Sequence, residues 1–247
     1  MTKKVIFCLP TIKKPYPQTM ESLADSIPLI HAAGWEEGTV YKIGSPYISC
    51  ARAEMLRKAL DAKADVIVFI DHDLSWDAQD LLTLIETEGD VVCGTYRFKE
   101  ESEVYMGALN STPDGFPVVF PDGTLSAHSA PAGFLKITKH CVNRFIAAYP
   151  ELTYGDKFSP HVDLFNHGAH KGTWYGEDYA FCRNWRDAGG VVKLVPNLNI
   201  SHWGADGTEY RGNFHFYLAR QPGGALYEEH DDGIHQTDRG GVRRSAA

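Results

Sequence analysis

Apolar residues in this chain occur in short unbroken runs that are separated by segments of mixed polarity. The most regular run is Val66–Ile70, which consists only of β-branched and aromatic residues. A run of this length and composition predicts a strand that is buried on both faces, as the strands of parallel sheets are. Comparable runs predict further strands at residues 5–9, 40–43, 90–94, 130–137, 191–195 and 198–204.

The segments between these runs have apolar residues at three- and four-residue spacing, which predicts amphipathic helices. The expected helices cover residues 18–33, 49–60, 76–86, 139–149 and 179–188. Pro28 argues for a kink or a break in the first of them. Strands that alternate with helices predict the α/β class, with a central, mostly parallel sheet that is flanked by helices.

Two stretches depart from this alternation. Residues 104–125 have turn sequences and no helical period, so we expect a small antiparallel patch there. Residues 150–174 are the least regular and contain His167 and His170. The spacing of these histidines could suggest a metal site, but the flanking glycines and the lack of periodicity favour a mobile loop that could close over a substrate.

The length of 247 residues suits one large domain better than two. We expect residues 1–204 to form a single Rossmann-like domain and residues 205–247 to form a C-terminal extension that is partly disordered. Within this extension, only Phe214–Ala219 has the pattern of an ordered element.

The composition limits the partners and the compartment of the protein. A formal net charge of −8 provides no basic footprint for nucleic acid or anionic membranes. No apolar segment approaches the roughly 20 residues of a transmembrane helix, and the N-terminal apolar run is too short for a secretory signal. The five cysteines are scattered and odd in number, which argues against a disulfide framework and against a zinc site. We therefore expect a cytoplasmic protein.

Candidate chemistry begins where the run Val66–Ile70 ends, because Asp71-His72-Asp73 follows directly. Open α/β sheets bind their ligands in the crevice beyond the carboxyl ends of their strands. Asp71 and Asp73 would project to the same side in continued strand geometry and would repel each other unless a cation joins them. The pair therefore predicts a divalent-metal site. The alternative is structural, with Asp71 opening a turn and Asp73 capping the next helix.

Three other residues lie at expected ligand positions. Thr11 follows the first expected strand at the same sheet edge, where it would contact a nucleotide or form an ordinary turn. Arg52 lies in the first turn of an expected helix, where the helix dipole disfavours a cation. We therefore expect an anion beside Arg52, either a diphosphate or a carboxylate, with a solvated surface arginine as the alternative. Gly133 starts a strand and permits close approach by a ligand or by backbone.

Acidic residues and a histidine mark two further positions. Glu177 and Asp178 follow Gly176 at the start of the expected helix 179–188. The helix dipole favours carboxylates there, so capping alone would explain them. His202 lies at the end of the last expected strand, and a lone histidine is usually structural.

The order of Asp71-His72-Asp73, Gly176-Glu177-Asp178 and His202 resembles that of the nucleotide-sugar-dependent glycosyltransferases of the GT-A fold. The resemblance covers about residues 3–204. Asp71-His72-Asp73 is similar to the DXD motif of that family. Gly176-Glu177-Asp178 is similar to the acidic motif that supplies the base in inverting members, and His202 is similar to the C-terminal metal ligand.

The resemblance implies an enzyme that moves a sugar from a nucleoside-diphosphate sugar, with a UDP-sugar as the expected donor, to an acceptor hydroxyl. Asp73 and His202 would bind Mn²⁺ or Mg²⁺, and Asp71 would contact the metal or the donor ribose. Asp178 would be the general base of an inverting transfer, and Glu177 would orient substrate hydroxyls. The remaining candidates for the donor site are Thr11, Arg52 and Gly133.

Two other classes of function stay open. One is another metal enzyme that acts on phosphate esters, a nucleotidyltransferase or a phosphohydrolase, although Leu9-Pro10-Thr11-Ile12 lacks the glycines of a phosphate loop. The other is a sugar-binding module without activity. The acceptor is open as well, among a glycan, a lipid-linked sugar, a protein and a modified nucleic acid.

Overall fold

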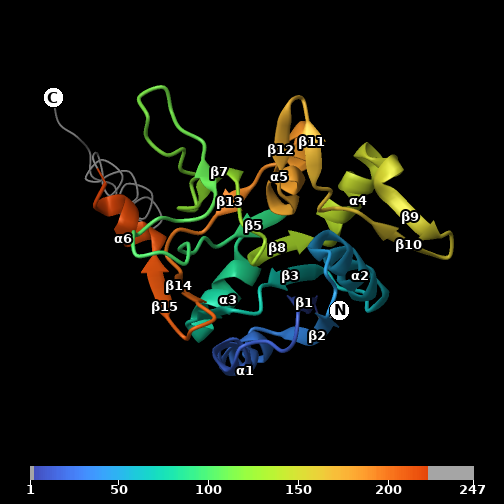
Figure 1. Ribbon diagram of the computed structural model, residues 1–247, viewed down its shortest axis with the longest axis horizontal. Helices are drawn as coiled ribbons and strands as arrows, with labels where there is room; N and C mark the ends of the chain where they lie inside the picture. The colour runs from blue at the N-terminus through green and yellow to red at the C-terminus, as the bar shows by residue number, and fades with distance from the viewer. Residues whose placement is uncertain (1–2, 222–247) are drawn as a thin grey trace, which may run out of the picture.

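The fold is built on an eight-stranded sheet with the strand order β2-β1-β3-β8-β5-β13-β7-β6 (Figure 1). The structure is a computed structural model and describes residues 3–221. The strands of this sheet are β1 (Lys3–Thr11), β2 (Trp35–Ile43), β3 (Val66–Ile70), β5 (Val91–Cys93), β6 (Ala108–Leu109), β7 (Leu125–Ser129), β8 (Phe134–Thr138) and β13 (Lys193–Leu194).

Strand directions agree with the predicted sheet. β1 pairs in parallel with β2 and β3, and β13 pairs in parallel with β5. β8 lies between β3 and β5 and is antiparallel to both. Strands β1, β2, β3, β5 and β13 therefore all run in one direction, which confirms an α/β fold with a mostly parallel sheet.

Helices cover both faces of the sheet, because alternate residues of each strand point to opposite sides. Along β1, Val5, Phe7 and Leu9 belong to one buried cluster, whereas Ile6 and Cys8 belong to another. The first cluster includes residues of α1 (Pro17–Ala32) and α3 (Ala78–Glu86), and the other includes residues of α2 (Ile48–Asp61), α4 (Lys139–Ala148) and α5 (Glu177–Asp187). Burial on both faces explains why the strands are unbroken apolar runs in the sequence.

Helices α1 and α3 differ from the sequence-based expectation. α1 continues through Pro28, so the break that was expected there is absent. α3 begins at Ala78 rather than at Trp76, because residues 74–76 form strand β4 instead. Asp77, and not Asp73, is therefore the residue that precedes the helix, and the structural alternative in which Asp73 caps it is wrong.

Strand β4 (Leu74–Trp76) belongs to a second sheet of three strands, with β14 (Asn199–Trp203) in the middle and β15 (Glu209–Asn213) at the other edge. β14 pairs antiparallel with β4, so that His202 lies opposite Leu74. The backbone N–H of Trp203 also donates to the carbonyl of Asp73, at 2.9 Å. This pairing brings a segment near the C-terminus beside the acidic motif that follows β3.

Residues 150–174 are more regular than the sequence predicts. After the 3₁₀ turn Pro150–Leu152 the chain forms two hairpins, β9 (Thr153–Asp156) with β10 (Ser159–Val162), and β11 (Gly168–His170) with β12 (Thr173–Tyr175). The lack of regular structure that favoured a loop here is wrong, because strands of three or four residues are too brief to show a period in the sequence. The mobility of this segment stays a prediction. The expected antiparallel patch is present as β6 and β7, with bridges such as Ser111 to Pro117.

The predicted C-terminal extension begins with ordered elements. β15 pairs with β14, and Phe214 of α6 (Phe214–Ala219) belongs to a core cluster. The predicted domain boundary at residue 204 stays a prediction, and the disorder that we expect toward the end falls on residues 222–247, outside the described residues. Among residues 3–221, no helix has both the length and the apolar character of a membrane span.

Candidate active site

A pocket opens at the carboxyl ends of β1 and β3, beside the start of α2. This is the edge of an α/β sheet at which ligands are expected to bind. Six of the eight candidate residues from the sequence line it: Thr11, Arg52, Asp71, Asp73, Glu177 and His202. Gly133 and Asp178 are not among its lining residues, but each adjoins one, as described below.

Arg52 is the central cation of the pocket. Its side chain is only 3% exposed, so a solvated surface arginine is excluded. One terminal nitrogen, Nη1, donates to the carbonyl of Ala132 at 3.0 Å, and the other, Nη2, lies 3.0 Å from Oδ1 of Asp71 and 3.6 Å from Oε1 of Glu177. The anion that the helix dipole argument required is therefore present, as two carboxylates from different motifs.

Removal of this cation should cost stability. In Arg52→Met the carboxylate of Asp71 would lose its buried partner, so we expect a loss of about 3 kcal/mol in the free energy of unfolding. Urea denaturation measures it. The control is Arg211→Met, since the ion pair of Arg211 with Asp77 is exposed and should contribute less than about 1 kcal/mol. Equal losses in the two variants would show that Arg52 does not organise the site.

Asp71 is held by protein groups on both of its oxygens. Besides the bond from Arg52 to Oδ1, the hydroxyl of Tyr96 donates to Oδ2 at 3.3 Å. A Cβ added at Gly133 would lie 2.4 Å from Oδ2 of Asp71 and 2.1 Å from the Tyr96 hydroxyl. The close approach that we expected at Gly133 is therefore made by these two side chains, and only glycine leaves room for them.

Asp73, which directly precedes β4, and His202, in the neighbouring strand β14, face each other. His202 Nε2 lies 3.5 Å from Oδ2 of Asp73, and each side chain is 13% exposed. His202 Nδ1 lies 2.8 Å from the carbonyl oxygen of Arg97. Since a carbonyl only accepts, Nδ1 carries a hydrogen and donates it, and Nε2 is the ring nitrogen that faces Asp73.

A lysine shares the same carboxylate. Lys99 Nζ lies 2.5 Å from Oδ2 of Asp73. Burial opposes ionisation of Asp73, but the hydrogen bonds from His202 and Lys99 outweigh it and hold the pKa of this carboxyl well below its ordinary value. Asp73 is therefore an anion throughout the physiological range.

Asp73 and His202 have the chemistry to bind a divalent cation such as Mn²⁺ or Mg²⁺, but as two ligands they do not form a complete coordination shell. No cluster of three or more His, Cys, Asp or Glu side chains arranged for a metal occurs within residues 3–221, and Asp71 is engaged by Arg52 and Tyr96. One carboxylate and one imidazole that is oriented by a backbone carbonyl nevertheless provide two ligands of the right chemistry. The other positions would be open to phosphate oxygens and water, as is usual for a cation that binds with a nucleotide.

Glu177 and Asp178 form the first turn of α5 and have different surroundings. Glu177 lines the pocket and lies near Arg52. Asp178 accepts from the backbone N–H of Tyr179 at 2.8 Å. Burial, with the neighbouring charge of Glu177, raises the pKa of Asp178 to about 6. A carboxyl with such a pKa can take up a proton at neutral pH and release it again.

Tyr96 joins the two halves of the site. Its buried ring packs edge-to-face on His202, with centroids 5.1 Å apart, and its hydroxyl binds Asp71. Burial raises its pKa well above the ordinary value, and so do the negative charges of Asp71, Asp178 and Asp73. The phenol of Tyr96 therefore lies among Asp71 of the acidic motif, the base candidate Asp178 and the metal-ligand candidate His202.

Thr11 ends β1 inside the pocket. The residue is 4% exposed, and within residues 3–221 its hydroxyl has no hydrogen-bond partner. A buried hydroxyl without a partner is costly unless a ligand or water satisfies it. This orphaned group agrees with a ligand contact at Thr11, which stays a prediction.

For two residues of the site, Tyr96 and Lys99, the sequence predicts no role beyond a position from which they could line the pocket. Tyr96 and Lys99 follow the strand that ends at Cys93, and their position at the sheet edge was the available signal. Nothing local distinguishes them from other polar residues of that loop, because their partners Asp71 and Asp73 are 25 and 26 positions away.

Comparison with known proteins gives similarity at the level of structure alone. No family model matches the chain, and neither does any curated protein sequence. Residues 1–349 of TarS from S. aureus align with 94% of this chain and 69% of their own length, at a TM-score of 0.43 and 12% identity.

Two further solved structures are similar. A β-1,4-galactosyltransferase 7 variant from Drosophila, solved with manganese, UDP-galactose and xylobiose, aligns over 89% of this chain and 76% of its own, with a TM-score of 0.40 and 13% identity. GalNAc-T7, solved with UDP, GalNAc and Mn²⁺, aligns over 81% of this chain but only 43% of its own, with a TM-score of 0.45 and 10% identity. The solved structures to which this chain is similar thus include a galactosyltransferase.

Proposed function

We propose that this protein is a glycosyltransferase that uses a divalent cation and a nucleoside-diphosphate sugar, with UDP-sugar as the expected donor. The observation that supports it best is the pairing of Asp73 with His202 in a pocket that is also lined by Glu177, the neighbour of Asp178 in the first turn of α5. A site for an anionic leaving group would then lie near a carboxyl that is able to take up a proton.

The proposed donor site combines negative carboxylates with a positive metal ion and a positive arginine. Asp71 and Asp73 would repel a diphosphate by about 4 kcal/mol for each pair of charges at 4 Å near a protein surface. A divalent cation on Asp73 and His202 would remove this repulsion and stabilise the charge that develops on the departing nucleoside diphosphate. Arg52 would hold Asp71 and Glu177 in fixed positions, and the free hydroxyl of Thr11 would bind the nucleotide end.

Asp178 is our proposed general base. The oxygen of the acceptor hydroxyl would form a bond to the anomeric carbon, the bond from that carbon to the diphosphate would break, and the hydroxyl proton would pass to the carboxylate of Asp178. Attack from the face opposite to the leaving group gives inversion. Glu177, which is tied to Arg52, would orient substrate hydroxyls.

The alternative functions differ in what they require. A nucleotidyltransferase would need a glycine-rich phosphate loop after β1, whereas β1 ends in Leu9-Pro10-Thr11 and continues with Ile12. A binding module without activity would need no proton acceptor, so the raised pKa of Asp178 would serve no purpose in it.

Thermal shift of the wild-type protein tests the proposal directly. We expect UDP or a UDP-sugar together with Mn²⁺ to raise the unfolding midpoint, because a ligand at 100 times its Kd adds about 2.7 kcal/mol of stability. Metal alone or nucleotide alone should give a much smaller shift. A panel of the other nucleoside diphosphates serves as the control and shows which nucleobase the site prefers. If no metal and nucleotide pair stabilises the protein, the transferase proposal fails.

A further inference from the structure

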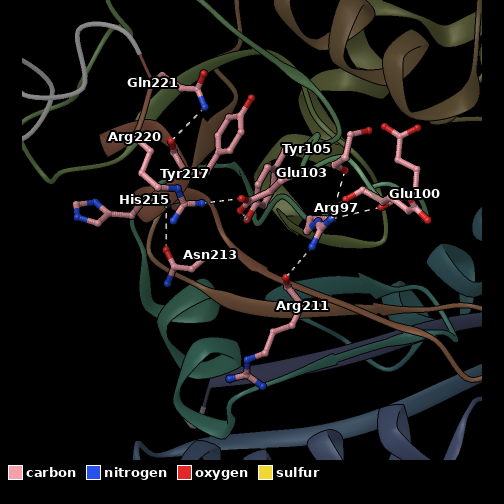
Figure 2. A network of polar contacts seen from close by, with 12 residues as sticks. Arg97, Glu100, Glu103, Tyr105, Arg211, Asn213, His215, Tyr217, Arg220 and Gln221 are labelled. Atoms are coloured by element: carbon pink, nitrogen blue, oxygen red, sulfur yellow. Dashed lines mark hydrogen bonds and ion pairs between the residues drawn. The ribbon is translucent and has the colours of Figure 1, made fainter.

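Arg97 fixes the loop that carries Lys99. Its Nη2 donates to the carbonyls of Glu100, Glu101 and Ser102, at 3.1 to 3.3 Å. Figure 2 shows this guanidinium at the centre of the loop, with Nη1 directed at the carbonyl of Arg211 in β15, 3.4 Å away. One side chain thus ties the loop to itself and to the three-stranded sheet.

The far end of the same loop is also anchored. The hydroxyl of Tyr105 donates to Oε1 of Glu103 at 3.1 Å, and Arg220 Nη2 lies 2.7 Å from Oε2 of the same carboxylate (Figure 2). The backbone N–H of Phe98 binds the carbonyl of Val104 at 2.9 Å. The position of Lys99 is therefore built into the fold by contacts on both sides of it.

Lys99 lies where a metal ion on Asp73 would lie. Its ammonium approaches Oδ2 of Asp73 at 2.5 Å, on the oxygen that also faces Nε2 of His202. An ammonium and a divalent cation cannot both occupy this oxygen. The lysine side chain is 34% exposed and flexible, so it can move aside while the loop keeps it near.

We infer that Lys99 is a cationic residue of the donor site that exchanges partners. It neutralises Asp73 when no divalent cation is bound, and it binds a phosphate oxygen of the donor when the cation takes Asp73. The inference rests on the proposed function, because it needs an anionic ligand at Asp73. It makes Lys99 a competitor of the metal in the empty site and a ligand of the diphosphate in the loaded one.

Calorimetric titration of Lys99→Met tests both proposed roles of Lys99, the competition with the metal and the contact with the diphosphate. Without nucleotide, the variant should bind Mn²⁺ about tenfold more tightly than the wild type, since the competing charge is gone. With Mn²⁺ saturating, it should bind UDP about tenfold more weakly, the size of one charge-assisted hydrogen bond. The matched control is Lys193→Met, which removes an ammonium that lies 2.5 Å from Asp122 outside the pocket and should change neither affinity.

The outcomes separate this inference from the function on which it rests. If wild-type protein binds UDP with Mn²⁺ and Lys99→Met leaves either affinity unchanged, the exchange of partners is wrong while the function stands. If wild-type protein binds no nucleoside diphosphate, both are wrong. Opposite changes in the two affinities, absent from Lys193→Met, support the assignment, because a general loss of folding would weaken both.

Discussion

Sugar transfer should fall by a factor of about 10² to 10⁴ in Asp178→Asn, the usual contribution of a positioned general base. Asparagine keeps the shape of the side chain and its hydrogen bond from the N–H of Tyr179, but it cannot accept a proton. Since the donor site is formed by other residues, UDP affinity with Mn²⁺ should stay within about twofold of the wild type. Initial rates with a UDP-sugar and calorimetric titration measure the two quantities.

The pH profile shows whether Asp178 acts as the base. Because its pKa is raised to about 6, the kcat/KM of the wild type should be level near pH 7 and fall about tenfold per pH unit well below pH 6. The residual activity of Asp178→Asn should lack this acid limb. If Glu177→Gln removes the limb and Asp178→Asn retains it, the base is Glu177 instead.

Asp178→Asn should also stabilise the protein at neutral pH. The folded state raises the pKa of Asp178 from 3.8 to about 6, so folding favours the protonated form. Stability therefore falls as the pH rises from 3.8 to about 6, and the whole penalty is present at pH 7. Asp178→Asn removes this penalty, and the unfolding midpoint should rise by about 2 to 6 °C. Asp187→Asn, at the exposed end of the same helix, should leave both the midpoint and the transfer rate unchanged.

The parts of the fold that the sequence predicts correctly are those where one segment decides its own structure. Val66–Ile70 forms β3, because a run without polar residues can only be buried on both faces. Arg52 meets carboxylates, because a cation in the first turn of a helix opposes the dipole and needs an anion. In both cases the physical conflict or preference is visible within a few residues.

The rest depends on contacts between distant segments. Asp73 and His202 are brought together by the pairing of β4 with β14, and the three residues of β4 are too few to show a strand period. Position along the chain alone does not show that Lys99 lies on Asp73, since the loop is shaped by Arg97 and by β15. The metal-ligand and base roles that the resemblance to a known motif order implies stay predictions, and the structure shows that Asp71 is bonded to Arg52 and Tyr96.

Because Asp71 is occupied in this way, donor binding should depend most strongly on the other carboxylate, and Asp73→Asn should have a large effect. The substitution keeps the volume but removes the charge that a cation between Asp73 and His202 would require. We expect UDP affinity in the presence of Mn²⁺ to fall by at least about 100-fold, since two unit charges about 4 Å apart near a protein surface interact by about 4 kcal/mol. The affinity for UDP without metal should not fall, because one source of repulsion is gone and Lys99 is released from its partner.

The matched control for this substitution is Asp122→Asn. Asp122 also pairs with a lysine at 2.5 Å but lies outside the pocket, so its loss should leave donor binding unchanged. In Asp73→Asn, manganese should no longer increase the affinity for UDP, because one imidazole alone is a weak site for such a cation. If manganese strengthens UDP binding in Asp73→Asn as much as in the wild type, the cation is held elsewhere. In that case the ion pair with Lys99 would be the whole role of Asp73.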